Sequence, residues 1–223
     1  MNRARVLGAV LVGGASSRFG SDKAAAAWRG EPLAAHAAAV LAPFCAAVVR
    51  VGGDGVPDRP RTGLGPLGGV AGALAHAEAL GFDTVLTIAC DMPRVPSALI
   101  EALLQSAPAC CADAPVLGHW PAGLAGSLLE RLAVSAEALH AFPLDAGLGL
   151  ASDVSGAHQT EALVVDQTPD RVRHDNGLSD SRSRHRRDGA LSVRRWVESV
   201  GALSIVSSVP LANVNTLADL LAL

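Results

Sequence analysis

Short apolar runs, separated by glycine, proline and polar residues, divide the first half of the chain into alternating elements. Three runs have the length and the β-branched content of buried strands: 6–12 (VLGAVLV), 46–51 (AAVVRV) and 84–90 (TVLTIAC). Three other segments repeat apolar residues at helical spacing: 32–41, 65–80 and 96–106. This alternation predicts an α/β protein with a Rossmann-like, doubly wound and mostly parallel sheet in three layers.

The periodic pattern fades in the second half of the chain and returns near its end. Three segments there have the patterns of further elements: a helix at 192–200, a strand at 202–207, and a short helix at 216–223 that Asn215 or Thr216 would cap. Before them, residues 168–189 are polar, hold six arginines and offer little to bury. We therefore expect one domain over 1–223 with a mobile insertion at about 136–189. The insertion is either tolerated without a role or acts as a basic cover over a substrate phosphate.

The loop after the first apolar run has the composition of a phosphate-binding turn. A strand that ends in a glycine-rich loop before a helix presents free backbone N–H groups to an anion. Gly13 and Gly14 lack a Cβ, so the backbone can turn sharply and approach a ligand closely. Arg18 adds charge. Lys23 is the only lysine among the 18 Lys and Arg residues, which suggests a compact ammonium beside a phosphate oxygen. The simpler alternative is an ordinary turn between a strand and a helix.

A carboxylate, Asp91, follows the third apolar run. Ligands of doubly wound sheets bind at the carboxyl ends of the strands, where Asp91 and the Gly13 loop would meet. One carboxylate suits Mg²⁺, which leaves its other positions to water and phosphate; a turn or capping role is the alternative. The stretch 63–68 (GLGPLG) also satisfies G-x-G-x-x-G. However, Pro57 and Pro60 exclude the preceding strand that a dinucleotide site requires.

Composition limits the partners that this chain could have. Half of its 223 residues are apolar and its net charge is −3, so nothing indicates a nucleic-acid partner. No apolar run is long enough to span a membrane. The run at 6–12 leads directly into the glycine loop, unlike a signal peptide. The cysteines lack metal-ligand spacing. We therefore expect a cytoplasmic protein whose reduced cysteines lie in the core: Cys45, Cys90, Cys110 and Cys111.

Residues 11–23 (LVGGASSRFGSDK) carry a resemblance to a known family. Their pattern L-x-G-G-x-S-x-R-x-G-x-D-K resembles nucleotidyltransferases that use a nucleoside triphosphate, most closely the molybdenum cofactor guanylyltransferases. Residues 90–93 (CDMP) match the C-D-x-P with which the family binds Mg²⁺, and residues 65–69 (GPLGG) resemble its G-P-L-x-G. The resemblance covers about 6–132 and 192–221. It implies GTP binding by these motifs and by an Asp shortly before the third: Leu11, Val12, Gly13, Gly14, Lys23, Asp58, Pro66, Leu67 and Asp91.

Two other segments resemble those that face the pterin substrate in this family. His119 and Trp120, in the sequence PVLGHWP, could stack on a pterin or hydrogen-bond to it, although such residues are more often part of a core or its rim. Asn213 and Asn215, in the sequence NVNT, match a pair of asparagines that the family links to pterin binding. The resemblance therefore implies a pterin site formed by these four residues.

The resemblance implies an enzyme that transfers GMP from GTP to the terminal phosphate of molybdopterin, or of its molybdenum-bound form, and releases pyrophosphate. Lys23, Arg18 and a magnesium ion on Asp91 would stabilise the charge on the phosphates. A molybdoenzyme or a cofactor chaperone would be a further partner. The family usually has an Asn at 51–53 and this chain has none, so a CTP-dependent or sugar-phosphate nucleotidyltransferase stays open. A GTP- and pterin-binding module without catalysis is the other alternative.

Overall fold

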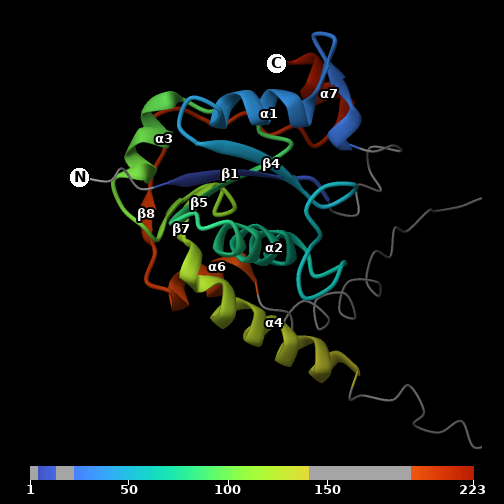
Figure 1. The fold of residues 1–223 in the computed structure, drawn as a ribbon. Helices are drawn as coiled ribbons and strands as arrows, with labels where there is room; N and C mark the ends of the chain where they lie inside the picture. The colour runs from blue at the N-terminus through green and yellow to red at the C-terminus, as the bar shows by residue number, and fades with distance from the viewer. Residues whose placement is uncertain (1–4, 14–22, 141–191) are drawn as a thin grey trace, which may run out of the picture.

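The computed structural model of the chain describes residues 5–13, 23–140 and 192–223, arranged around one main sheet (Figure 1). The described residues form a six-stranded sheet. Its strands are, in spatial order, β4 (Ala47–Val51), β1 (Val6–Leu11), β5 (Thr84–Ala89), β7 (Gly118–Pro121), β6 (Ala109–Cys111) and β8 (Leu203–Ile205). β1 is parallel to both β4 and β5, whereas β7 runs antiparallel between β5 and β6. The prediction of a mostly parallel sheet is confirmed.

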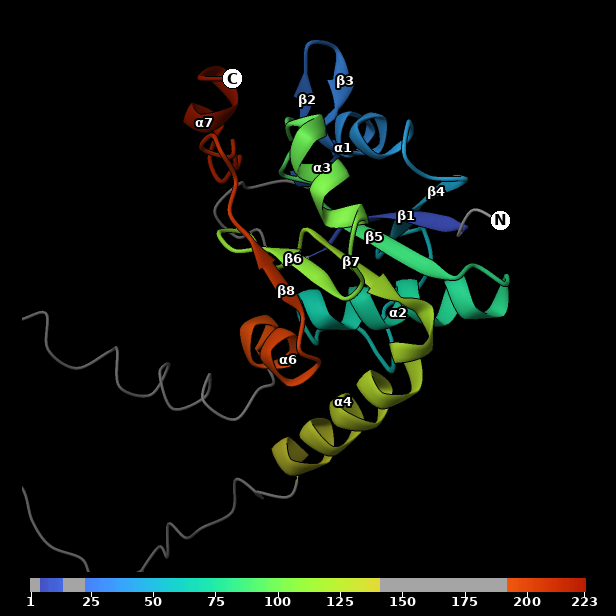
Figure 2. The same ribbon diagram turned by 90° about the vertical axis from the view of Figure 1, so that its left-hand side faces the viewer.

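Helices cover both faces of this sheet and give the three predicted layers (Figures 1 and 2). One face carries α1 (Leu33–Leu41) and α3 (Ser97–Leu104); the other carries α2 (Pro66–Ala79), α4 (Ala125–His140) and α6 (Val193–Ser199). The smaller elements are the 3₁₀ turns η1 (Lys23–Ala25) and η2 (Ala122–Leu124), the hairpin of β2 (Ala27–Trp28) and β3 (Glu31–Pro32), and α7 (Leu217–Leu221). The hairpin packs beside α7.

The side chains of β1 alternate between the two halves of the core, because successive residues of a strand point to opposite faces. Leu7 and Ala9 pack toward α2, and Val10 packs toward α1 and α3. Small residues bring neighbouring segments unusually close. A Cβ on Gly72 of α2 would lie only 2.4 Å from the carbonyl oxygen of Pro57. The close contact fixes the loop before α2 against the helix that follows it.

Several predicted boundaries differ slightly from those observed. α1 begins at Leu33, and Pro32 precedes it as the cap instead of occupying the first turn. Thr216 caps α7: its hydroxyl accepts from the Asp219 N–H, and the Asp219 carboxylate accepts from the Thr216 N–H. The first five residues of the insertion expected at about 136–189 belong to α4, which continues through His140. The rest of that predicted insertion, from residue 141, lies outside the described residues.

The four cysteines are free, and Cys90, Cys110 and Cys111 are buried, as predicted for core residues. Burial raises the pKa of the Cys45 thiol to about 12. This thiol therefore stays protonated at neutral pH and is a poor nucleophile. Among the helices of the described ranges, none is both long enough and apolar enough to cross a bilayer.

Candidate active site

The carboxyl ends of β1 and β5 meet at one edge of the sheet. Leu11 pairs with Ala89, and the Cys90 N–H donates to the Leu11 carbonyl at 3.1 Å. Gly13 follows β1 and Asp91 follows β5, so the two loops lie next to each other. From β1 the chain passes through α1 to β4, whereas from β5 it passes through α3 toward the opposite side of the sheet. This divergence is the topological switch point at which doubly wound sheets bind their ligands.

A cavity of about 380 Å³ opens beside this switch point. It lies between the ends of β1 and β4 and the loop that leads into α2. Five of the residues predicted to bind GTP line it: Leu11, Val12, Gly13, Asp58 and Pro66. Val51, Gly63, Gly65 and Gly69 complete the lining. Its volume falls within the range of small-molecule sites, roughly 300–1,000 Å³.

Leu67 and Asp91, also predicted to bind GTP, are not among the described residues that line this cavity. The Leu67 side chain is fully buried in the core against β1, and its contact with GTP stays a prediction. As the second residue of α2, Leu67 faces the sheet, and only its backbone lies near the cavity. Lys23 begins the η1 turn, but its side chain lies outside the described residues. Gly14 and Arg18 also lie outside them.

Among the described residues that line the cavity, Asp58 is the only acidic one. Burial raises the pKa of its carboxyl group, and the carboxylate forms no hydrogen bond or ion pair with any residue in the described ranges. Its Oδ1 lies within 4 Å of the positions that a Cβ on Gly52 and on Gly69 would occupy. A carboxylate that is partly desolvated and unpaired is stabilised by a ligand that donates hydrogen bonds to it.

Glycine at position 52 brings the end of β4 against the end of β1. A Cβ on Gly52 would lie 1.9 Å from the Val12 carbonyl oxygen, and its φ is +95°. The Val12 N–H donates to the Val51 carbonyl at 2.8 Å, which holds the two strand ends together. No side chain fits at this position. At position 52 the absence of an Asn is therefore built into the backbone path.

The C-terminal segment returns to the switch point. The N–H of Val214, which is fully buried, donates to the Asp91 carbonyl at 2.9 Å. Asn213 and Asn215 flank Val214 and are exposed. This contact brings both predicted pterin residues of the NVNT segment next to the residue predicted to bind Mg²⁺, although more than a hundred positions separate them in the sequence.

The structure places His119 and Trp120, which were predicted to face a pterin, in the core of the domain. Both lie on β7, which runs antiparallel, so Trp120 pairs with Val85 near the amino end of β5. Trp120 is fully buried, its indole N–H donates to the Thr87 hydroxyl at 2.8 Å, and its ring packs on that of Trp196. His119 is also buried, with Nδ1 at 2.9 Å from the Ser106 carbonyl oxygen. Both side chains are part of the core.

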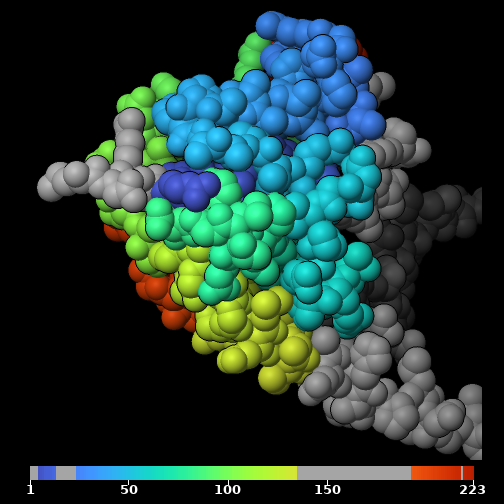
Figure 3. All heavy atoms as spheres, viewed as in Figure 1, coloured from blue at the N-terminus to red at the C-terminus, as the bar shows by residue number. Residues whose placement is uncertain are grey.

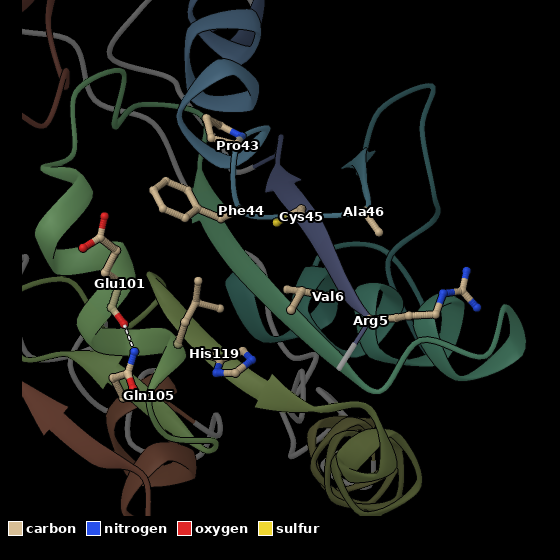
Figure 4. Close-up of a pocket in the computed structure, with 10 residues that line it drawn as sticks. Arg5, Val6, Pro43, Phe44, Cys45, Ala46, Glu101, Gln105 and His119 are labelled. Atoms are coloured by element: carbon tan, nitrogen blue, oxygen red, sulfur yellow. Dashed lines mark hydrogen bonds between the residues drawn. The ribbon is translucent and has the colours of Figure 1, made fainter. Parts of the chain in front are cut away.

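His119 instead lies beside a hollow at the opposite edge of the sheet (Figure 4). This hollow has a volume of about 860 Å³, and Arg5 and Val6, at the amino end of β1, form part of its wall. Phe44, Glu101 and Gln105 line it from the side of α1 and α3. None of the predicted GTP-binding residues in the part of the chain that the structure describes borders this hollow. It is separate from the cavity at the switch point.

Comparison with known proteins agrees with this geometry. Residues 8–147, which are more than half of the chain, match the MobA-like NTP transferase domain. The chain belongs to this family. The matched part includes both loops of the switch point and the whole lining of the 380 Å³ cavity.

Several relatives of the chain are named molybdenum cofactor guanylyltransferase. The one from Rhodobacter capsulatus is 34% identical over 115 residues, which is 47% of this chain and 60% of that protein. The one from Rhizobium leguminosarum bv. trifolii is 36% identical over 148 residues, covering 57% of this chain and 69% of the relative. The one from Cereibacter sphaeroides is 34% identical over 146 residues, covering 58% of this chain and 76% of the relative. The chain thus matches between three fifths and about three quarters of the length of these relatives.

A solved structure resembles the chain over almost its whole length. The Rv0371c homologue from Mycobacterium sp. strain JC1 has a TM-score of 0.53 and 16% sequence identity, with coverage of 97% of this chain and 93% of that one. At this level of identity, the likeness concerns the fold alone.

In this MobA-like domain, the sequence motifs identified part of the cavity but missed its glycine wall. Gly63, Gly65 and Gly69 line the cavity, although only Pro66 and Leu67 were predicted from that segment. Gly63 and Gly65 have φ values of +83° and +67°, a conformation that favours glycine. The GLGPLGG run contained this signal.

Proposed function

We propose that this chain transfers GMP from GTP to the terminal phosphate of molybdopterin or of its molybdenum-bound form, and releases pyrophosphate. One observation carries the proposal. The Asp58 carboxylate lines a cavity beside the Gly13 loop and has no partner among the described residues. The family of the chain and the names of its relatives support the same chemistry.

A carboxylate at Asp58 favours guanine among the common bases. Guanine presents two adjacent donors, the ring N1–H and the 2-amino group, and a carboxylate can accept both. Adenine and cytosine present a ring nitrogen acceptor at the corresponding edge, which would face the carboxylate as an unpaired acceptor. Since Gly52 leaves no room for a side chain, other contacts to the base come from the backbone of Val12, Gly13 and Val51.

The loops at the switch point would position the triphosphate next to the acceptor. The backbone N–H groups of the Gly13 loop, together with Arg18 and Lys23, would bind phosphate oxygens. An oxygen of the acceptor phosphate would attack the α-phosphorus in line, forming a new P–O bond. The bond from the α-phosphorus to the bridging oxygen of the β-phosphate breaks, and pyrophosphate leaves. The acceptor phosphate is already anionic and needs no general base.

Asp91 fits a magnesium ion of the kind that nucleotide enzymes use. It is a partly exposed carboxylate at the strand end next to the phosphate loop. No cluster of three or more His, Cys, Asp or Glu residues suited to a metal occurs in the described ranges. A single carboxylate is enough for Mg²⁺, which commonly takes one or two carboxylates and completes its shell with phosphates and water. When bound, the ion would offset the charge on the phosphates.

The proposal is tested by measuring pyrophosphate release from GTP, CTP, ATP and UTP with Mg²⁺, with and without molybdopterin. We expect release from GTP only, only with molybdopterin, and none in an Asp91→Ala variant that still folds. A preference for CTP would assign the chain to a sister activity on the same scaffold. Binding of GTP without any release would identify a non-catalytic module and overturn the proposal.

A further inference from the structure

Two arginines stack on one tryptophan at the end of the molecule that carries the switch point. The Cζ atom of Arg29 lies 4.6 Å from the centre of the Trp28 ring, and that of Arg94 lies 4.9 Å from it. The ring of His36 packs edge-on against the same indole at 4.6 Å. His36 Nε2 donates to the Trp28 carbonyl at 2.7 Å, since a carbonyl oxygen can only accept. These contacts fix the indole and, with it, the two guanidinium groups.

Neither guanidinium is neutralised within the described ranges. Arg29 and Arg94 are both exposed, and no described carboxylate forms an ion pair with either of them. Glu31, the nearest acid to Arg29 along the chain, is the strand partner of Trp28, and Asp91 is the nearest acid to Arg94. Two positive charges on one ring repel each other. A bound anion would relieve this repulsion and would meet two planar donors held in fixed positions.

Arg29 occupies a backbone position that suits a different residue. Together with Gly30 it forms the two-residue turn between β2 and β3, with φ values of 51° and 85°. Turns of this kind favour Asn-Gly, and a long side chain at the first position is uncommon. Arg29 is the only non-glycine residue with positive φ among the described residues. The sequence keeps an arginine where an asparagine would fit the backbone better.

The arginine pair lies on the acceptor side of the switch point. Arg94 follows Asp91 by three residues, which places their Cα atoms within about 11 Å. Trp28 packs against the cluster of Leu33, Val214 and Leu220, and the Val214 N–H donates a hydrogen bond to the Asp91 carbonyl. The cavity with Asp58 lies on the other side, between β1 and β4. Figure 3 shows the blue hairpin of residues 27–32 at the top of the molecule, above the cyan loop that follows β4.

We propose that Arg29 and Arg94, held in place by Trp28, bind an anionic part of the acceptor substrate that is distinct from its reacting phosphate. This inference rests on the proposed function, because it names the acceptor side of the same site. The nucleotide cannot be the occupant when its base lies at Asp58 and its phosphates lie at the Gly13 loop. The pair would orient the acceptor so that its phosphate points toward Asp91.

The kinetic test uses the double variant Arg29→Gln/Arg94→Gln of the full chain. We expect its KM for molybdopterin to rise about tenfold or more, with the KM for GTP and kcat within twofold of the unaltered chain. Arg194→Gln, on the exposed side of α6, is the matched control and should change none of these values. An acceptor KM that is unchanged in the double variant would overturn the proposal. The single variant Arg29→Asn should raise the melting temperature, because Asn suits the turn. It should still weaken binding of the acceptor.

A second readout does not depend on turnover. Trp120 and Trp196 are fully buried and Trp28 is the remaining tryptophan, so quenching of fluorescence by iodide reports mainly on Trp28. Relative to the neutral quencher acrylamide, iodide should quench the unaltered chain more strongly than the double variant. Direct binding of molybdopterin without GTP should weaken tenfold in the double variant and lose part of its salt dependence.

The two proposals can fail separately. If the chain binds molybdopterin through these arginines but releases no pyrophosphate, the anion site stands and the transferase activity falls. If the chain transfers GMP and the double variant binds and uses molybdopterin normally, the anion site is wrong and the activity stands. Failure of the unaltered chain to bind molybdopterin at all would also overturn the anion site.

Discussion

At the scale of single residues, Asp58 combines a proposed role in GTP binding with a cost to stability. Burial raises the pKa of its carboxyl group, so the folded state favours the protonated form. The contribution of this group to the free energy of unfolding is fully present below the ordinary pKa of an Asp. It is lost as the pH rises through the raised value. At neutral pH the carboxylate is therefore unfavourable for folding. The proposed contact with guanine would offset this cost when GTP is bound.

Replacing Asp58 with Asn tests this trade-off. Asp58→Asn should raise the melting temperature slightly at pH 7, by on the order of 1–2 °C, and should give no gain near pH 3. It should also raise the KM for GTP at least tenfold, because an amide cannot accept both guanine donors. Thermal unfolding at several pH values, together with GTP titration, measures both effects. A variant that loses stability at pH 7 and keeps its GTP affinity would contradict both assignments.

The same carboxylate predicts how GTP binding depends on pH. GTP affinity should fall as the pH drops through the raised pKa of Asp58, because the protonated acid accepts fewer hydrogen bonds. The loss should begin at a higher pH than for an exposed Asp. Calorimetric titration with GTP from pH 7 to pH 4 measures it, and Asp58→Asn should flatten the profile. An equally steep profile in the variant would assign the titration to another group.

Trp120 illustrates a residue whose chemistry suggested a ligand and whose position assigns it to the core. Trp120→Phe should lower the free energy of unfolding by about 2 kcal/mol, because it removes the bond to Thr87 and part of the contact with Trp196. Denaturant unfolding measures this loss. The KM for molybdopterin should stay within twofold in the folded variant. A large rise in that KM without a loss of stability would return Trp120 to the substrate site.

At the scale of elements, the sequence predicted the long parallel strands and their helices well but missed several short elements. The runs that became β1, β4 and β5 are continuous and apolar, which is the pattern of a strand buried on both faces. The hairpin of β2 and β3 has two-residue strands, and its alanine-rich sequence favoured a helix. Only the Arg29-Gly30 turn signalled it. The direction of β7 depends on contacts with β5 and β6 that are distant in sequence, so periodicity alone could not place His119.

The junction of β1 and β4 gives a prediction at this scale. Gly52→Ala should destabilise the protein by roughly 2–4 kcal/mol, because its Cβ would lie 1.9 Å from the Val12 carbonyl and its φ is positive. The variant should also weaken GTP binding, since Val12 lines the cavity. Gly81→Ala is the matched control: its φ of +70° is similar, but nothing lies within 4 Å of its Cβ. It should cost only about 1 kcal/mol. Equal losses in the two variants, measured by denaturant unfolding, would show that the strand junction tolerates a side chain.

At the scale of the whole molecule, the candidate site joins segments from both ends of the chain. The cavity takes its walls from β1, β4 and the start of α2, and the C-terminal segment is bonded to the loop after β5. The glycine loop and Asp91 could be assigned to one edge from sequence, because parallel strands end together. The packing of the NVNT segment against Asp91 could not be derived from the pattern of residues, and only the family resemblance suggested it.

Because the site joins these segments, its ligand should stabilise the entire domain. At about 100 times its dissociation constant, a ligand that binds only the folded state adds about 2.7 kcal/mol. In a domain of this size, that corresponds to a rise in melting temperature of about 5–10 °C. GTP with Mg²⁺ should produce such a rise, and GTP with a chelator a smaller one. If Asp91 holds the ion, the Asp91→Ala variant should keep the smaller rise and gain nothing when Mg²⁺ is added. An undiminished effect of Mg²⁺ in that variant would place the ion on other ligands.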